Sequence, residues 1–265
     1  MSANAPRLLI IAGSDSSGGA GFQADIKTAG AFGVYAMTAI TAVTVQDTLR
    51  VHSIQLLSPK VVRDQIRVCL SDIGADAIKI GMLGSAEIVD AVVGALKRHA
   101  PDTPIVLDPV MVSTSGKHLL PREAVGTFTS KLLPVVSVVT PNLPEARALA
   151  GMRGTDRKAA EVAGRKLMQM GARAALIKGG HATRETVDDV LIWQGGVEIY
   201  AFPRLRTKHT HGTGCVLSTA IACGLAKGDS LPLATGRARE FVQHAIETAP
   251  GLGQGHGPLN LLCGR

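Results

Sequence analysis

The stretch H-T-H-G-T-G-C at residues 209–215 has the residue types that bind phosphate at the start of a helix. An apolar run follows it at once, so Gly212, Thr213 and Gly214 lead into a predicted helix. The first turn of a helix leaves N–H groups without partners, and these donors together with the helix dipole attract anions. The same field lowers the pKa of a cysteine below about 8.5, which makes Cys215 a candidate for handling a proton. A glycine-rich turn with a buried structural cysteine is the alternative.

A lysine and two glycines end another short predicted strand, in L-I-K-G-G-H at residues 176–181. At such a strand end Lys178 can reach a phosphate group, and Gly179 lets a nucleotide lie against the backbone. A surface lysine before a turn explains the pattern equally well. These residues are therefore cofactor-binding candidates only in combination with other motifs.

The stretch T-P-N-L-P-E at residues 140–145 contains two oxygen-bearing side chains three positions apart. Asn142 and Glu145 share a face of the first turn of a predicted helix. Their oxygens can hold Mg²⁺, usually through water molecules. The same spacing is typical of a capping box, in which the pair closes the start of the helix. On these residues alone, the cap is the favoured interpretation.

The first glycine-rich loop, A-G-S-D-S-S-G-G-A-G at residues 12–21, follows a predicted strand directly. It predicts a wall that a small ligand can approach closely. Residues 19–24 also fit G-x-G-x-x-A, a dinucleotide-binding pattern, which leaves a nicotinamide oxidoreductase as a rival. That rival is weak because the nearest suitable acid, Asp47, is a loose match. A P-loop is excluded because Gly19 stands where its lysine belongs.

The strand V-T-V-Q at residues 43–46 ends in an amide side chain. The amide of Gln46 offers a donor and an acceptor, so it can pair with the edge of an aminopyrimidine. An ordinary polar residue at a strand end is the simpler interpretation when the motif is taken alone.

Predicted strands and helices alternate along the whole chain. Strands are expected at 8–12, 37–45, 51–57, 77–80, 105–108, 135–140 and 174–178, with a hairpin at 190–193 and 197–202. Helices are expected at 22–32, 59–72, 86–99, 214–227 and 231–248. This order with apolar strands predicts an α/β fold, with a mainly parallel sheet covered by helices on both faces. Without a linker or repeat, residues 1–265 are expected to form a single domain.

Composition argues against several other classes of protein. The net charge of +7 is scattered, and aromatic residues make up only 3% of the chain, which disfavours nucleic-acid binding. No apolar run approaches the roughly 20 residues that span a bilayer, and no secretory leader opens the chain. The cysteines lack paired spacing, so a cytoplasmic setting is expected. His209 and His211 are two apart, but with no third ligand nearby a role in the loop is favoured over a metal site.

The order of these motifs resembles the hydroxymethylpyrimidine and phosphomethylpyrimidine kinases of thiamine biosynthesis, within the ribokinase superfamily. The segments A-V-T-V-Q, K-I-G-M-L, V-T-P-N-L-P-E-A, K-G-G-H and H-G-T-G-C carry the resemblance, which runs from about residue 8 to 260. It implies a ribokinase-like fold and an enzyme that uses ATP and Mg²⁺. The implied reactions are phosphorylation of 4-amino-5-hydroxymethyl-2-methylpyrimidine and then of its monophosphate. Homodimers are expected by the same resemblance.

The resemblance also assigns roles to individual residues. Cys215 matches the position of the catalytic aspartate of sugar kinases, and Gly212–Gly214 match an anion hole. Lys178 matches a nucleotide-side lysine, and Asn142 with Glu145 a magnesium-associated pair. Residues 109–116 match a mobile flap. Predicted substrate-binding residues are Gln46 for the aminopyrimidine edge, Asp25 for the alcohol, and Gly13, Ala20, Val43, Met82 and Val110 for the ring pocket.

Two rival functions remain at this point. A pyridoxal kinase of the same superfamily is the nearer one, although such kinases can carry a cysteine in the flap and residues 109–118 contain none. A non-catalytic pyrimidine-binding sensor is more remote, because it would not need an anion hole beside a candidate base.

Overall fold

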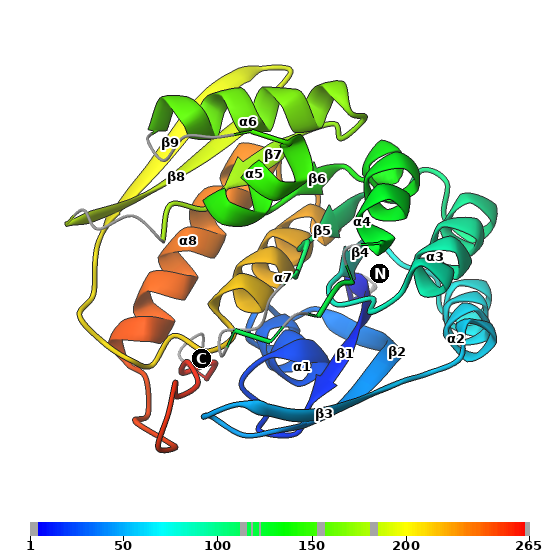
Figure 1. Cartoon of the computed structure of the whole chain (residues 1–265), viewed down its shortest axis with the longest axis horizontal. Coiled ribbons are helices and arrows are strands. Elements are labelled where there is room, and N and C mark those ends of the chain that lie inside the picture. The colour runs from blue at the N-terminus through cyan, green and yellow to red at the C-terminus, as the bar shows by residue number, and fades with distance from the viewer. Residues whose placement is uncertain are drawn as a thin grey trace.

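One nine-stranded sheet crosses the molecule, in the order β3-β2-β1-β4-β5-β6-β7-β8-β9. The structure is a computed structural model, and it describes residues 5–111, 116–117, 119–121, 123–152, 157–180 and 185–262. Figure 1 shows the sheet passing through the molecule, with the first strands in blue and β8 and β9 in yellow-green.

The strands that position the site run parallel to one another. They are β2 (Tyr35–Gln46), β1 (Arg7–Asp15), β4 (Ala77–Ile80), β5 (Ile105–Leu107), β6 (Val138–Val139) and β7 (Ala175–Ile177). Antiparallel neighbours close both sides: β3 (Val51–Leu56) pairs with β2, and the hairpin of β8 (Thr186–Trp193) and β9 (Gly196–Pro203) extends from β7. The expected mainly parallel sheet with one hairpin is confirmed, and the pairings of β3 with β2 and of β8 with β7 are also antiparallel.

Helices cover both faces of this sheet (Figure 1). One face packs against α2 (Pro59–Asp72), α3 (Ala86–His99), α4 (Ala124–Thr127) with its π and 3₁₀ continuations (Phe128–Leu132, Leu133–Val135), α5 (Leu143–Ala150) and α6 (Arg157–Gln169). The other face packs against α1 (Gly21–Ala31), α7 (Thr213–Ala226) and α8 (Leu231–Glu247).

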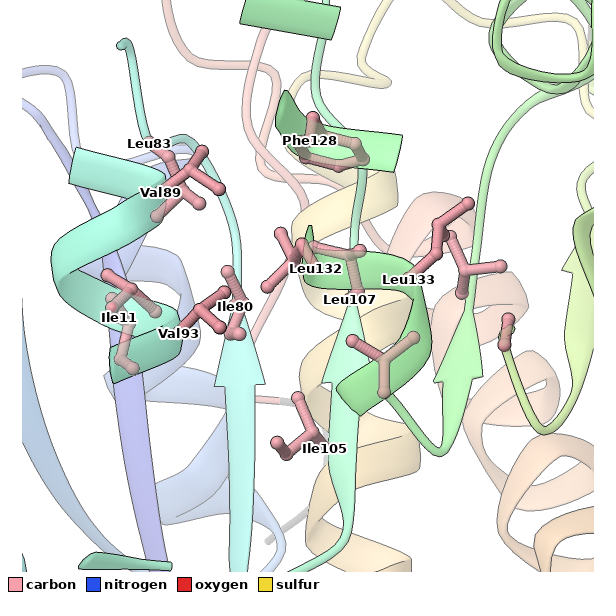
Figure 2. Packing of buried hydrophobic residues seen from close by; sticks show 14 of the residues in the cluster. Ile11, Ile80, Leu83, Val89, Val93, Ile105, Leu107, Phe128, Leu132 and Leu133 are labelled. Carbon is pink, nitrogen blue, oxygen red and sulfur yellow. The ribbon is translucent and has the colours of Figure 1, made fainter. Parts of the chain in front are cut away.

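Alternation along each strand divides the apolar residues between two cores. In β1, Leu9 and Ile11 belong to the first core, whereas Leu8 and Ile10 belong to the second, because successive side chains of a strand point to opposite faces. Figure 2 shows the first core, where Ile11, Ile80 and Leu107 lie beside side chains from α3 and from the segment after α4.

The ends of two helices follow directly from the sequence. Ser58 and Ser85 accept hydrogen bonds from the backbone N–H groups of Val61 and Ile88, at 3.4 and 3.3 Å, and a serine cap of this kind defines a helix start. As a result α2 and α3 begin and end at the predicted residues, 59–72 and 86–99. Among the helices in the described ranges, none combines the length and apolarity needed to cross a membrane.

The parallel strands all end at the same edge of the sheet, which gathers the predicted motifs there. Gln46 is the last residue of β2, Asp15 ends β1, Asp108 follows β5, and Lys178 follows β7. In open α/β sheets ligands bind beyond these carboxyl ends.

Candidate functional site

A cavity of about 1110 Å³ lies along the carboxyl edge of the sheet. The first loop and β2 line one end, the start of α7 lies at its middle, and residues of α8 and the segment after β9 reach the other end. Such a volume is at the upper end of the range for small-molecule sites, roughly 300–1,000 Å³. It therefore has room for a ring-sized ligand and a larger partner.

The start of α7 opens into this cavity through Gly212, Thr213 and Gly214. Gly212 adopts a φ of 83°, and a Cβ added there would overlap the carbonyl oxygen of Gly19. Only glycine therefore fits between the first loop and the helix. Helical geometry leaves the N–H groups of Gly214 and Cys215 without a partner inside the helix. These N–H groups at the cavity wall are the donors of the predicted anion hole, and together they are called the cradle below.

Cys215 lies in the first turn of α7 and lines the cavity. Burial raises the pKa of its thiol to about 11, although Lys79 and a hydrogen bond from Gly21 act to lower it. The expectation of a lowered pKa is therefore wrong, because the removal of water outweighs the helix field. Near neutral pH the sulfur keeps its proton.

This state of Cys215 predicts slow alkylation. At about pH 7.5 we expect iodoacetamide to modify Cys215 far more slowly than a free cysteine, because only the thiolate reacts. The rate should rise with pH up to the thiol pKa of about 11. Mass spectrometry of the peptide containing Cys215 measures this rate, and rapid modification at neutral pH would contradict the prediction.

A buried ion pair lies behind the cavity wall. Lys79 Nζ is 2.7 Å from Asp25 Oδ2, both side chains are 0% exposed, and Thr219 donates to Asp25 Oδ1 at 2.7 Å. Burial acts to lower the pKa of Lys79, but Asp25 and nearby acidic groups raise it, so the ammonium is retained. Lys79 lines the cavity, whereas Asp25 does not. The predicted contact between Asp25 and an alcohol is corrected: both its oxygens are engaged inside the protein.

Removing Lys79 should strongly destabilise the fold. Lys79→Met leaves a buried carboxylate without its partner, which typically costs about 3–5 kcal/mol of unfolding free energy. The double variant Lys79→Met, Asp25→Leu should recover much of that loss, because neither charge then remains. Urea denaturation of the three proteins measures the difference, and equal stability of the single and double variants would contradict this account.

Asp108, Lys178 and Glu145 form a charged cluster opposite the start of α7. Lys178 Nζ lies 2.9 Å from Asp108 Oδ1. A Cβ added to Gly214 would come within 3.1 Å of Lys178 Nζ and 3.2 Å of Asp108 Oδ2, so the cluster borders the anion cradle. Burial raises the pKa of Glu145 to about 7, Lys178 opposes this, and Asp108 adds to it. The arrangement offers one cation and two acids beside a phosphate-binding turn.

Asn142 and Glu145 form the capping box that the sequence favours. Asn142 Oδ1 accepts from the Glu145 N–H, and Glu145 Oε2 accepts from the Asn142 N–H, both at 2.8 Å. Both side chains also line the cavity. The cap therefore uses the single amide oxygen of Asn142 and one carboxylate oxygen of Glu145.

Gln46 lines the same cavity, together with residues of the first loop. Of the predicted ring-pocket residues, Gly13, Ala20, Met82 and Val110 line the cavity.

Val43 is placed differently from its prediction. It is 48% exposed and lies outside the cavity lining, whereas Thr44 is buried and lines it. The prediction for Val43 has the wrong parity: with alternating side chains, only Thr44 and Gln46 share the face that meets the cavity.

Gly179 also serves a different purpose from the predicted one. Its N–H donates to Asp189 Oδ1 at 2.8 Å, and an added Cβ would overlap the carbonyl oxygen of Asp188. Its neighbour Gly180 lines the cavity instead. The glycine is therefore required by the approach of β8, a contact that the motif does not reveal. His181 and residues 112–115 of the expected flap lie outside the described part of the chain.

Sequence reasoning missed Asp15, Lys79, Asp108 and His211, all of which line the cavity. Two of them carried a usable signal: Asp108 directly follows an apolar strand, and Lys79 is a charge inside a four-residue strand that is otherwise apolar. Within the described ranges, no cluster of three or more His, Cys, Asp or Glu side chains is arranged to hold a metal ion.

Comparison with known proteins agrees with this geometry. The family model described as phosphomethylpyrimidine kinase matches residues 15–260. A hydroxymethylpyrimidine/phosphomethylpyrimidine kinase of Streptomyces coelicolor is 46% identical over 256 residues, which cover 96% of this chain and 94% of the relative.

Solved structures with the same fold include a phosphomethylpyrimidine kinase and a pyridoxal kinase. The phosphomethylpyrimidine kinase of Clostridium difficile 630 is 37% identical, with a TM-score of 0.81, and covers 92% of this chain and 100% of its own. A pyridoxal kinase of Staphylococcus aureus, in complex with AMP-PCP and pyridoxal, is 32% identical with a TM-score of 0.90, over 98% of this chain and 94% of its own. The ribokinase-like fold is confirmed, and the chain belongs to the phosphomethylpyrimidine kinase family.

Proposed function

We propose that the chain transfers the γ-phosphoryl group of ATP to the alcohol of 4-amino-5-hydroxymethyl-2-methylpyrimidine, and then a second phosphoryl group to the monophosphate. One observation carries the proposal: a single cavity joins an amide side chain suited to an aminopyrimidine, a helix N-terminus suited to phosphate, and a lysine beside two acids.

In this proposal the two substrates enter from opposite ends of the cavity. The pyrimidine lies against Gln46, and the γ-phosphoryl group lies at the N–H groups of Gly214 and Cys215. The nucleotide extends past Lys178 toward Gln243 and Ile246, which line the far end. This arrangement puts the alcohol oxygen and the γ-phosphorus next to each other at the mouth of α7.

The chemistry requires little covalent participation by the protein. The alcohol oxygen bonds to the γ-phosphorus as the bond to ADP breaks, and the alcohol proton is released. Phosphoryl transfer has a loose transition state, so charge stabilisation and positioning dominate. The cradle of α7 stabilises the charge on the phosphoryl oxygens, and removal of one such donor typically costs about 2.7–4 kcal/mol. Because the Cys215 thiol keeps its own proton, we assign it the orientation of the alcohol.

The residues beside the cradle fit Mg²⁺. Glu145 and Asp108 supply carboxylate oxygens, Asp108 helps to raise the pKa of Glu145, and Lys178 Nζ lies 2.9 Å from Asp108 Oδ1. A divalent cation prefers such oxygen ligands together with phosphate oxygens. We propose that Glu145 and Asp108 hold Mg²⁺, with Asn142 orienting Glu145. The ion would neutralise charge on the transferred phosphate.

Gln46→Ala should raise the KM for the pyrimidine alcohol much more than the KM for ATP. The variant loses both hydrogen bonds to the ring edge. The polar groups of that edge are then left without partners in the pocket, which weakens binding strongly. Steady-state kinetics with each substrate varied in turn measures both constants. Equal changes in the two KM values would argue against this role of Gln46.

The decisive test is a paired assay of ATP consumption with two alcohols. We expect rapid turnover with the aminopyrimidine alcohol and much slower turnover with pyridoxal. The structural likeness to a pyridoxal kinase makes pyridoxal the second candidate, and a higher kcat/KM for pyridoxal would replace the proposed function by that one. If neither the aminopyrimidine alcohol nor pyridoxal supports release of ADP, both candidate functions are overturned. Homodimer formation remains a prediction of the family resemblance.

A further inference from the structure

Four polar side chains from three distant segments of the sequence meet at the pyrimidine end of the cavity. His211 Nε2 lies 2.8 Å from Asp15 Oδ2 and 3.3 Å from the Gln46 amide nitrogen. The Gln46 amide oxygen lies 3.2 Å from Thr44 Oγ1. All four side chains line the cavity, and the function proposed above explains only Gln46.

The contact with Asp15 determines which atom of His211 carries a proton. Asp15 also accepts hydrogen bonds from the Ser17 N–H, the Ser17 hydroxyl and the Ala20 N–H. Burial acts to raise the pKa of Asp15, but the contacts with His211 and Ser17 lower it below its ordinary value. A carboxylate only accepts hydrogen bonds, so His211 Nε2 must be the donor. A ring nitrogen that bears a proton cannot also accept from the amide of Gln46.

The position of the His211 ring is itself fixed. The side chain is buried, its backbone N–H donates to the Gly257 carbonyl at 3.1 Å, and an added Cβ on Gly19 would come within 2.6 Å of its Cδ2. The ring therefore has little room to move away from Asp15.

Thr44, on the other side of the amide, also determines which end of the Gln46 amide faces it. Its hydroxyl lies 2.7 Å from the carbonyl oxygen of Ser14, which can only accept, so the single hydroxyl proton is used there. The other neighbour of that hydroxyl must then be a donor. The group of Gln46 that faces Thr44 is therefore its NH₂, because the carbonyl end would leave two acceptors in contact.

The two constraints agree on one orientation of the amide. The two ends of a glutamine amide have nearly the same shape, so its hydrogen-bond partners decide which end is which. We propose that Asp15, through His211, and Thr44 lock Gln46 with its carbonyl toward His211 and its NH₂ toward Thr44, and so select rings that carry an acceptor nitrogen beside an exocyclic amino group. His211 is then a positioning residue that acts through Gln46.

This orientation also sets the direction of the ring, an argument that rests on the proposed function. In the pyrimidine alcohol, the carbon bearing the amino group lies between the ring nitrogen and the carbon bearing the hydroxymethyl arm. The amino group pairs with the carbonyl end of Gln46, on the His211 side, so the arm lies on that side too. His211 directly precedes Gly212 and the cradle. The opposite amide orientation would turn the alcohol away from the phosphoryl group.

The test compares two alcohols that differ at a single ring position. The 4-oxo analogue of the substrate presents N–H and C=O where the 4-amino compound presents a lone pair and N–H, so it needs the opposite amide orientation. Wild-type protein should prefer the 4-amino alcohol by about 10⁴-fold or more in kcat/KM, because mismatched polar groups are strongly rejected. In His211→Leu only the contact with Thr44 still favours this orientation. The opposite orientation becomes accessible, so this preference should fall by about 100-fold, with the KM for ATP unchanged.

His209→Leu is the matched control, because His209 belongs to the same loop and has no hydrogen bond to Gln46 in the described structure. It should keep the wild-type preference. A His211→Leu variant that loses activity equally toward both alcohols would show a merely structural role and overturn the inference. Equal turnover of both alcohols by wild-type protein would also overturn it. A wild-type protein inactive toward the 4-amino alcohol would instead overturn the proposed function.

A second measurement requires no variant in the test itself. Nitrogen-15 NMR of histidine-labelled protein reports which ring nitrogen of His211 carries a proton, with His211→Leu used only to assign the signal. We expect the proton on Nε2. A neutral ring protonated at Nδ1 alone would overturn the inference, even if the protein proved to have another substrate.

Discussion

Gly212→Ala should lower kcat by at least about 100-fold, the typical effect of losing one donor of an oxyanion hole. The reason is steric and local. Gly212 has a φ of 83°, and an added Cβ would overlap the Gly19 carbonyl oxygen, a backbone atom that cannot rotate away. The start of α7 must move from the first loop, and the N–H groups of Gly214 and Cys215 move with it. Single-turnover measurements with ATP and the pyrimidine alcohol would detect the loss in the chemical step.

Gly228→Ala separates this effect from backbone strain. Gly228 follows the other end of α7 and has a similar φ of 86°, but nothing in the described structure lies within 4 Å of an added Cβ. Both variants carry the strain of a side chain in the left-handed region, about 1–3 kcal/mol. Only Gly212→Ala should lose activity. Equal kcat values for the two variants would contradict a cradle at the start of α7.

Local signals in the sequence define most of the fold. Serine caps and amphipathic spacing are properties of neighbouring residues, and they are sufficient to give α2 and α3 their observed bounds. The turns from Phe128 to Pro134 have no counterpart in the prediction, and Val135, expected to begin a strand, ends the 3₁₀ turn instead. The π and 3₁₀ turns are short and contain Pro134, so no regular period marks them. The π turn packs against α3, a tertiary contact that sequence periodicity cannot reveal.

The candidate site was predictable where its chemistry lies in one short segment, and less so where it depends on contacts. In the H-G-T-G-C turn the glycines directly precede an apolar helical run. The helix start and its free N–H groups can therefore be predicted from neighbouring residues alone. The sequence assigns His211 a role in the loop because no third metal ligand lies near it, and its contact with Asp15, 196 residues away, has no local signal. Val43 is assigned to the ring pocket from the family resemblance and not from strand parity, which depends on which face of β2 meets the cavity.

Cys215→Ala should fold normally and lose most of its turnover. Small, partly buried and at the first turn of α7, the residue can be replaced by alanine with a modest loss of packing. The alcohol, however, loses the group that orients it, and a misplacement of about 1 Å costs about 100-fold in rate. Thermal unfolding should therefore change little, while kcat falls by about that factor. A kcat like that of wild-type protein would remove Cys215 from the chemistry.

The pH dependence of kcat in wild-type protein distinguishes orientation from base catalysis by Cys215. Burial favours the protonated sulfur and raises the pKa of the thiol to about 11. If the thiolate were the active form, the rate of the chemical step would rise about tenfold per pH unit from neutral pH toward that value. If the thiol orients the alcohol, Cys215 adds no such rise. We expect the second result, because a loose phosphoryl-transfer transition state needs little removal of the alcohol proton before the phosphorus–oxygen bond to ADP breaks. A tenfold slope that disappears in Cys215→Ala would instead identify the sulfur as the base.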